Sequence, residues 1–204
     1  MHRQAIRLVW CVVLAGCTGP QFGSLRRTGA AVDLIAPASS ARLVFVRPAT
    51  LVGDNTTPII IERHSLRPFA ESPARTVVTL DVAPGQYEFC LANPALNQNR
   101  WRQINWWIDL SGSFRTPLTR VEVAAGRTYV FEVRVLQTGM ELTPARRDSN
   151  RMRRLEEWLP ELEVLTPIAD TPVLKAEPEE IAPWMESCVD STPERWQMGV
   201  DDGR

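Results

Sequence analysis

Short runs in which every second residue is apolar fill most of the sequence between residues 41 and 136. In residues 76–82, Val78, Leu80 and Val82 lie on one side of an extended chain, whereas Thr79 and Asp81 lie on the other. This period of two is typical of a β-strand with one buried face. Because the runs alternate with turn residues at short intervals, they predict an all-β sandwich.

Two turn sequences within this region predict hairpins. Ala83-Pro84-Gly85 follows the run just described and precedes a second one, residues 86–92. Its Pro fixes φ at one position and its Gly permits a positive φ. Ala124-Ala125-Gly126 separates residues 118–123 from residues 127–136 in the same way. We expect each pair of runs to form an antiparallel hairpin.

Four further strands are expected. Residues 42–47 are apolar toward both sides and end at Pro48, which predicts a strand covered on both faces. Residues 59–61 are three isoleucines, whose β-branched side chains favour a strand. Residues 104–110 alternate well enough to form another strand, and residues 162–165 a final edge strand.

After Pro144 the period of the apolar residues changes from two to 3.6, which predicts one short helix. Asp148 or Ser149 can cap its N-terminus, and Pro160 ends it. The apolar stripe of this helix consists of Met152, Leu155, Trp158 and Leu159. A helix of about ten residues is marginal alone, so we expect it to pack on the sandwich.

The last part of the chain, residues 166–204, contains nine acidic and three basic residues and is rich in Pro and Glu. This composition predicts a disordered acidic tail and argues against a nucleic-acid-binding protein. A basic cluster stands at the start of the helix and consists of Arg146, Arg147, Arg151, Arg153 and Arg154. We interpret it as a solvated helix face; anionic headgroups are an alternative partner, and the acidic tail can fold back onto it.

The first 17 residues have the layout of an export signal. Arg3 and Arg7 precede an apolar run, residues 8–15, which is too short to span a hydrocarbon core of about 30 Å. Leu14-Ala15-Gly16-Cys17 resembles the lipobox of bacterial lipoproteins. That resemblance implies transfer of a diacylglyceryl group to the thiol of Cys17, cleavage just before it and acylation of the new amino group, which would hold the mature protein on a membrane. An ordinary secretory signal with an incidental cysteine, and an uncleaved anchor, remain as alternatives.

The chain then divides into four parts. Residues 1–16 are the expected signal peptide, and residues 17–40 a lipidated tether, which we expect to be mobile because it is small, polar and rich in turn residues. Residues 41–165 form the sandwich and its helix, and residues 166–204 the tail. In that family, Asp directly after the cysteine is the usual signal for retention in the inner membrane. Thr18 in that place implies the periplasmic face of the outer membrane of the cell envelope.

The cysteines leave one candidate disulfide. Of the four, Cys11 lies in the signal peptide and Cys17 is the expected site of lipidation. Cys90 and Cys188 remain, and disulfides persist in exported proteins. The alternative is that Cys90 is a small buried hydrophobe and Cys188 a free thiol.

Three motifs of the predicted sandwich together resemble a known family. They are Ala41-Arg42-Leu43-Val44-Phe45-Val46-Arg47-Pro48, Val82-Ala83-Pro84-Gly85-Gln86-Tyr87-Glu88-Phe89-Cys90 and Ala124-Ala125-Gly126-Arg127-Thr128-Tyr129. They are similar to motifs in a family of bacterial lipoprotein domains of unknown function, itself related to the PEGA-like and transthyretin-like sandwiches. The resemblance covers residues 41–136 and implies a small antiparallel, Ig-like or transthyretin-like β-sandwich.

Catalytic and metal-binding chemistry finds little support in the residues. His64 is the single histidine outside the expected signal peptide, and its neighbour Ser65 would point to the opposite face of a strand. One histidine and two distant cysteines show none of the usual metal-ligand spacings, and no Gly-rich phosphate loop is present. We therefore expect a protein that is not an enzyme, with no catalytic residues, metal or cofactor.

The best candidate for a binding surface is an aromatic and basic stretch, which contains Arg100, Trp101, Arg102, Trp106 and Trp107. An outward-facing Trp flanked by Arg can stack on a sugar ring or anchor a protein partner. The favoured alternative is that the helix covers the outer Trp, which makes both structural. The leading hypothesis is thus an envelope lipoprotein with a structural or protein-interaction role; the alternative is a module that binds peptidoglycan or lipopolysaccharide.

Overall fold

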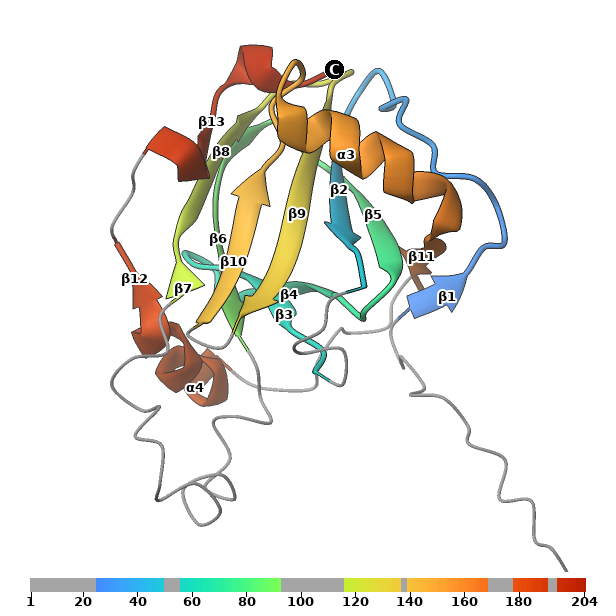
Figure 1. Cartoon of the computed structure of the whole chain (residues 1–204). Helices are drawn as coiled ribbons and strands as arrows, with labels where there is room; N and C mark the ends of the chain where they lie inside the picture. Colours follow the sequence, from blue (N-terminus) through green and yellow to red (C-terminus); the bar gives the residue numbers. More distant parts are fainter. Residues whose placement is uncertain (1–24, 50–55, 93–115, 137–138, 169–177, 191–193) are drawn as a thin grey trace, which may run out of the picture.

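The computed structural model describes residues 25–49, 56–92, 116–136, 139–168, 178–190 and 194–204. These residues are mainly β, which confirms the predicted fold class. Two sheets face each other and form the sandwich, and helices lie outside the sheets (Figure 1).

The larger sheet has six strands. In spatial order they are β1 (Leu25–Arg27), β11 (Glu163–Pro167), β5 (Thr76–Val82), β2 (Ala41–Arg47), β9 (Thr128–Leu136) and β10 (Gly139–Pro144). The second sheet has five strands, in the order β13 (Gln197–Met198), β8 (Thr119–Val123), β6 (Gly85–Ala92), β3 (Ile59–Glu62) and β4 (Arg67–Glu71). A short pair, β12 (Cys188–Val189) and β7 (Thr116–Pro117), lies beside it.

The main core fills the space between the two sheets. Its centre is aromatic: the Phe45 ring of β2 lies 5.4 Å from that of Phe131 in β9 and 5.9 Å from that of Phe89 in β6, centroid to centroid. All three side chains are fully buried. Such pairs contribute roughly 0.5–1.5 kcal/mol each beyond the area they bury, so these contacts hold the two sheets together.

Neither predicted hairpin around the two turn sequences forms. β5 belongs to the six-stranded sheet and β6 to the five-stranded sheet, so Ala83-Pro84-Gly85 carries the chain across the core. Ala124-Ala125-Gly126 does the same between β8 and β9. The apolar faces of each pair of strands therefore point toward one another through the core. The alternating pattern correctly predicts the buried face of each strand, but it does not distinguish these two arrangements.

The sheets are also mixed rather than antiparallel throughout. β2 pairs in parallel with β9, and β11 pairs in parallel with β5. In the second sheet β13 pairs in parallel with β8. The reason is the connectivity: the chain passes to the opposite sheet between β2 and β3, β4 and β5, β5 and β6, and β8 and β9, so that strands distant in sequence become neighbours.

The hairpin formed by β9 and β10 was not expected from the sequence. β9 and β10 pair antiparallel, with Leu136 opposite Gly139. Met140 and Leu142 of β10 are buried in the main core. The strand is hard to see in the sequence because it is bounded by Gly139 and Pro144 and contains two polar residues.

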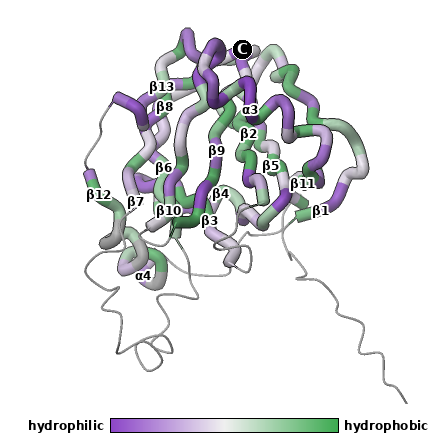
Figure 2. Tube along the Cα trace, viewed as in Figure 1, coloured by the Kyte–Doolittle hydropathy of each residue, from purple (hydrophilic) through white to green (hydrophobic). Residues whose placement is uncertain are grey.

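The predicted short helix is α3 (Asn150–Trp158). Its N-cap is Ser149, whose Oγ accepts a hydrogen bond of 3.1 Å from the backbone N–H of Met152. Pro160 lies in the single 3₁₀ turn η1 (Leu159–Glu161), which follows the helix. The apolar stripe packs on Val44, Val46 and Val130, on the outer face of the six-stranded sheet. The other residues of α3 are hydrophilic (Figure 2).

Much of the expected tether is part of the fold. β1 pairs with β11, with Leu25 opposite Pro167, so β11 is an internal strand rather than the edge strand that was predicted. Farther along, the backbone oxygen of Leu34 accepts a 2.7 Å hydrogen bond from Oγ1 of Thr128. Apolar residues of this segment pack against the sheet, which its polar composition concealed.

The tail is likewise ordered where the structure describes it, contrary to the prediction. It contains α4 (Pro178–Ile181), η2 (Ala182–Ser187), η3 (Glu194–Trp196) and η4 (Val200–Asp202), besides β12 and β13. Trp196 is 5 % exposed and Met198 3 % exposed. A few apolar residues thus anchor a segment whose average composition is that of a disordered chain.

Residues 199–204 dock onto the start of β9. The backbone groups of Arg204 and Thr128 exchange two hydrogen bonds of 2.9 Å. The hydroxyl of Tyr129 donates to the backbone oxygen of Val200 at 3.0 Å and accepts from the backbone N–H of Ala124 at 3.0 Å. These bonds fix the Tyr129 ring, against which Gly203 lies.

This docking predicts an effect of a single methyl group. In Gly203→Ala the new Cβ would lie 2.8 Å from Cζ of Tyr129, which is too close for two carbon atoms. Overpacking against a fixed ring typically costs about 1–3 kcal/mol of unfolding free energy, measurable by urea denaturation. The matched control is Gly199→Ala, whose Cβ would meet Asp202 at an ordinary 3.9 Å. Equal stability of the two variants would contradict the docking described.

Candidate functional site

The candidate site lies on the outer face of the five-stranded sheet, where a segment from the tail crosses it. We call residues 178–190, which comprise α4, η2 and β12, the C-terminal strap. β12 pairs with β7, and the backbone N–H of Leu118 donates to the oxygen of Val189 at 3.2 Å. The strap thereby lies beside the sheet at the end where β7 begins (Figure 1).

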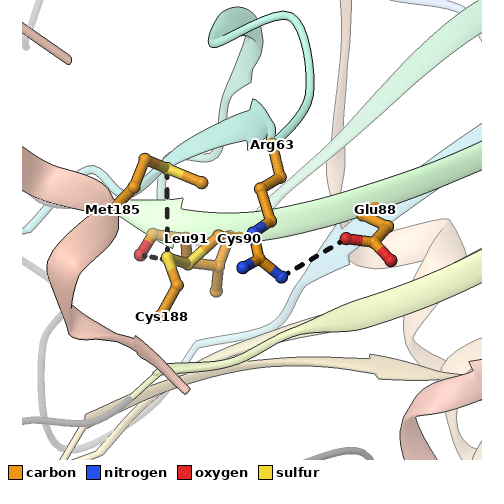
Figure 3. The surroundings of a disulfide bond; sticks show 6 residues. All are labelled: Arg63, Glu88, Cys90, Leu91, Met185 and Cys188. Atoms are coloured by element: carbon orange, nitrogen blue, oxygen red, sulfur yellow. Dashed lines mark hydrogen bonds and ion pairs between the residues drawn. A yellow bond between two sulfur atoms is a disulfide. The ribbon is translucent and has the colours of Figure 1, made fainter. Parts of the chain in front are cut away.

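A disulfide bond joins the strap to the sheet (Figure 3). It links Cys90 of β6 with Cys188 of β12, 98 residues apart, with a Cα–Cα distance of 6.1 Å. Cys90 is fully buried, whereas Cys188 is half-buried. Of the two arrangements that the sequence left open, the structure contains the bridge. Sδ of Met185 lies 3.9 Å from Sγ of Cys188.

Under the strap lies a small apolar cluster separate from the main core. Ile59, Ile61 and Ala92 project from β3 and β6, and Ile181 of the strap closes over them and is itself 1 % exposed. Met185 packs against the same cluster. The strap therefore covers an apolar strip that the sheet alone would leave open to solvent.

Next to the disulfide, charged side chains connect the strap with two strands. Glu88 of β6 accepts from Arg120 of β8 at 2.7 Å. It also pairs with Arg63 at 3.4 Å (Figure 3). Asp190 of the strap lies 2.9 Å from Arg120 and 3.9 Å from Arg63. The hydrogen bond to Glu88 raises the pKa of Arg120 above its ordinary value. Both arginines thus bind carboxylates from the sheet and from the strap.

A second polar group surrounds Glu62, at the end of β3. Its carboxylate accepts from the backbone N–H and the Oγ of Ser65, at 2.7 and 2.6 Å, and from the backbone N–H of His64 at 3.1 Å. Burial raises the pKa of Glu62, but these hydrogen bonds outweigh it, so that the pKa is lowered overall. The carboxylate thus satisfies backbone N–H groups of the tight turn between β3 and β4, in which Leu66 has a φ of 51°.

We expected His64 and Ser65 to lie on a strand, but they lie in this turn. The Ser65 hydroxyl donates to Glu62 rather than to the imidazole, and Nδ1 of His64 lies 3.2 Å from the same carboxylate. The arrangement stabilises a turn, and both side chains are directed at the Glu62 carboxylate rather than at each other. Across the residues that the structure describes, no three His, Cys, Asp or Glu side chains are grouped so as to hold a metal ion.

The basic cluster at the start of α3 is only partly a solvated face. Arg146 donates to the backbone oxygens of Glu194 and Gln197 at 2.9 and 3.2 Å, and Arg151 pairs with the buried Glu132 of β9. The acidic tail thus folds back onto Arg146, as one interpretation of the sequence proposed. The side chains of Arg147, Arg153 and Arg154 are exposed.

The other predicted site residues lie outside the described residues. These are Cys17 and the aromatic and basic stretch with Arg100, Trp101, Arg102, Trp106 and Trp107. The predicted strand at residues 104–110 lies outside them as well. Conversely, the network of Arg63, Glu88, Arg120 and Asp190 was missed. The only indication of this network in the sequence was a charged residue in the middle of a strand that otherwise alternates. The pairing register of β6 and β8 was needed to show that the four side chains meet.

The sequence matches no protein-family model, and comparison with curated proteins and with solved structures also finds no match. In the described part of the chain, no helix is both long enough and apolar enough to cross a membrane.

The hydrogen bonds to Glu62 predict a pH dependence. Since its folded-state pKa lies below the ordinary value of 4.5, this group stabilises the fold above that pH, and its contribution is lost as the pH falls through the folded pKa. Glu62→Gln should reduce the unfolding free energy at pH 7 by about 1–3 kcal/mol and flatten its decline between pH 6 and pH 3. Ser65→Ala should flatten it less. Urea denaturation across this range measures both effects, and an unchanged slope in Glu62→Gln would refute the assignment.

Proposed function

We propose that this chain is a lipid-anchored protein of the bacterial cell envelope, in which the β-sandwich acts as a structural or protein-interaction module. The observation that carries the proposal is Leu14-Ala15-Gly16-Cys17 at the end of a short apolar run that follows two arginines. Acyl chains on Cys17 would fix the protein to the membrane, because two or three such chains make a stable anchor. Thr18 favours the periplasmic face of the outer membrane.

The disulfide supports an exported location. Disulfides form and persist in oxidising compartments such as the periplasm and are rare in the cytosol. Cys90 and Cys188 are 98 residues apart in the sequence, and their bond joins the strap to the sheet. Such a bond is typical of a secreted or periplasmic protein, and this argument is independent of the lipobox.

The start of β1 limits how far the domain stands from the anchor. Eight Cα–Cα steps separate Cys17 from Leu25, the first residue of β1. At ~3.5 Å for each step the chain reaches at most about 28 Å. A lipid-anchored domain of this kind would work close to its membrane, which suits a partner that is itself part of the envelope.

A second candidate function is glycan binding through residues 100–107. This stretch connects β6 with β7, the two strands next to the disulfide, and its Trp and Arg side chains match the chemistry that stacks on sugar rings. Peptidoglycan or lipopolysaccharide would be the ligand. Glycan binding stands second because the same tryptophans can instead be structural, covered by the helix that bears Trp158.

The lipid anchor is tested at Cys17. Cys17→Ser should abolish incorporation of radiolabelled palmitate and release the protein from the membrane fraction, because a serine hydroxyl does not replace the thiol as acceptor of the diacylglyceryl group. Cys11→Ser, in the same leader, is the matched control and should keep both label and membrane location. Labelled, membrane-bound Cys17→Ser protein would show that the lipoprotein assignment is wrong.

The two candidate functions are separated by Trp106→Ala and Trp107→Ala. If the stretch binds glycan, one variant should fold normally yet lose at least about tenfold in retention on purified peptidoglycan or lipopolysaccharide, as expected for an interface aromatic. If both variants lose unfolding free energy instead, the tryptophans are structural. Recovery of an envelope protein by crosslinking in intact cells, unaffected by either variant, would favour the interaction module.

A further inference from the structure

The described parts of the tail are attached to the sandwich in two different ways. Residues 194–204 belong to it: β13 extends the five-stranded sheet, and Met198 is part of the main core between the sheets. The C-terminal strap, residues 178–190, contributes to the separate cluster on the outer face. Loss of the strap would therefore leave the main core intact.

The strap has little capacity to hold itself in place. α4 has four residues and η2 has six, and helices this short are not stable alone. β12 pairs with β7 over two residues. The ion pairs of Asp190 are partly exposed, and exposed pairs of this kind contribute little. The disulfide is the one covalent tie between the strap and the sheet among the described residues.

We propose that the Cys90–Cys188 disulfide is a thiol-sensitive latch, whose reduction releases the strap from the sheet while the sandwich stays folded. The inference depends on these contacts and not on the lipid anchor. Its co-reactant is a dithiol, either a small molecule or an exported thiol–disulfide oxidoreductase.

The chemistry begins at Cys188, because Cys90 is fully buried and Cys188 is half-buried. A thiolate of the dithiol attacks Sγ of Cys188, which breaks the S–S bond and expels the Cys90 thiolate. The second thiol of the reductant, once deprotonated, then attacks the reductant's other sulfur, which is bonded to Cys188 in the mixed disulfide, and expels the Cys188 thiolate. Two electrons pass to the protein, its two thiolates take up the two protons that the dithiol releases, and the reductant becomes a disulfide.

Release would change the chemistry of the sheet surface. Ile59, Ile61 and Ala92 would become accessible as an apolar strip. Arg63 and Arg120 would lose Asp190 but keep Glu88. The exposed surface would thus be apolar with a basic border, which is complementary to the apolar and acidic character of the strap itself.

Two native methionines report on the latch. Met185 lies in the strap and Met198 in the main core. In protein labelled with ¹³C in the methionine methyl groups, a soluble paramagnetic agent broadens the NMR signals of exposed methyls. On treatment of the folded, oxidised protein with dithiothreitol, we expect broadening of Met185 to increase at least fivefold and that of Met198 to stay unchanged.

Two variants test whether the disulfide, and not the ion pairs of Asp190, holds the strap. Cys90→Ser with Cys188→Ser should give the open state without reductant, and Asp190→Asn in the oxidised protein should stay closed. If the double variant fails to fold, reduction of the folded wild-type protein still decides the question. No change at Met185 after complete reduction would show that the strap holds without the bond, and simultaneous change at both methionines would show that the bond holds the whole edge. Either result overturns the latch.

Discussion

The contact between the two sheets through Phe45, Phe89 and Phe131 is the interaction on which the rest of the fold depends. Each sheet has one face that is too apolar to stand in water, and each supplies the cover of the other. The chain reaches this arrangement by crossing the core after β5 and after β8, so that successive strands face one another. Parallel neighbours such as β2 and β9 follow directly from those crossings.

The outer faces present the same problem on a smaller scale, and the chain solves it twice. α3 covers part of the six-stranded sheet. Its N-terminus is capped by Ser149, and its apolar stripe is buried against the sheet. The strap covers part of the five-stranded sheet with much shorter elements and needs a covalent bond to Cys90. The two covers therefore differ in how they are held, and only the second can respond to the redox state of its surroundings.

The sequence predicted local features well because they depend on neighbouring residues. The strands at residues 42–47, 59–61 and 76–82, and the helix with Ser149 as its cap, were visible from periodicity and capping alone. Which sheet a strand joins is decided by contacts far along the chain, and so both hairpins were predicted wrongly. The ordered structure of residues 25–40 and of the described parts of the tail was not predicted, for a related reason. Mean composition hides a few apolar residues whose burial is enough to hold each segment against the sheets. Within the candidate site, the cysteine pair was foreseen as one of two alternatives, while the ion-pair network around Glu88 required the register of β6 and β8.

The pairing of β1 with β11 joins two parts of the chain that are made at very different times. Thr28 donates a hydrogen bond to Val164, 136 residues later, and β11 lies between β1 and β5 in the sheet. The first strand of the domain therefore has no partner until nearly the whole sandwich has been synthesised. Contacts of such high sequence separation make folding slow. In a chain with this topology, this edge of the six-stranded sheet can be completed only after β2, β5, β9 and β10 have all been made.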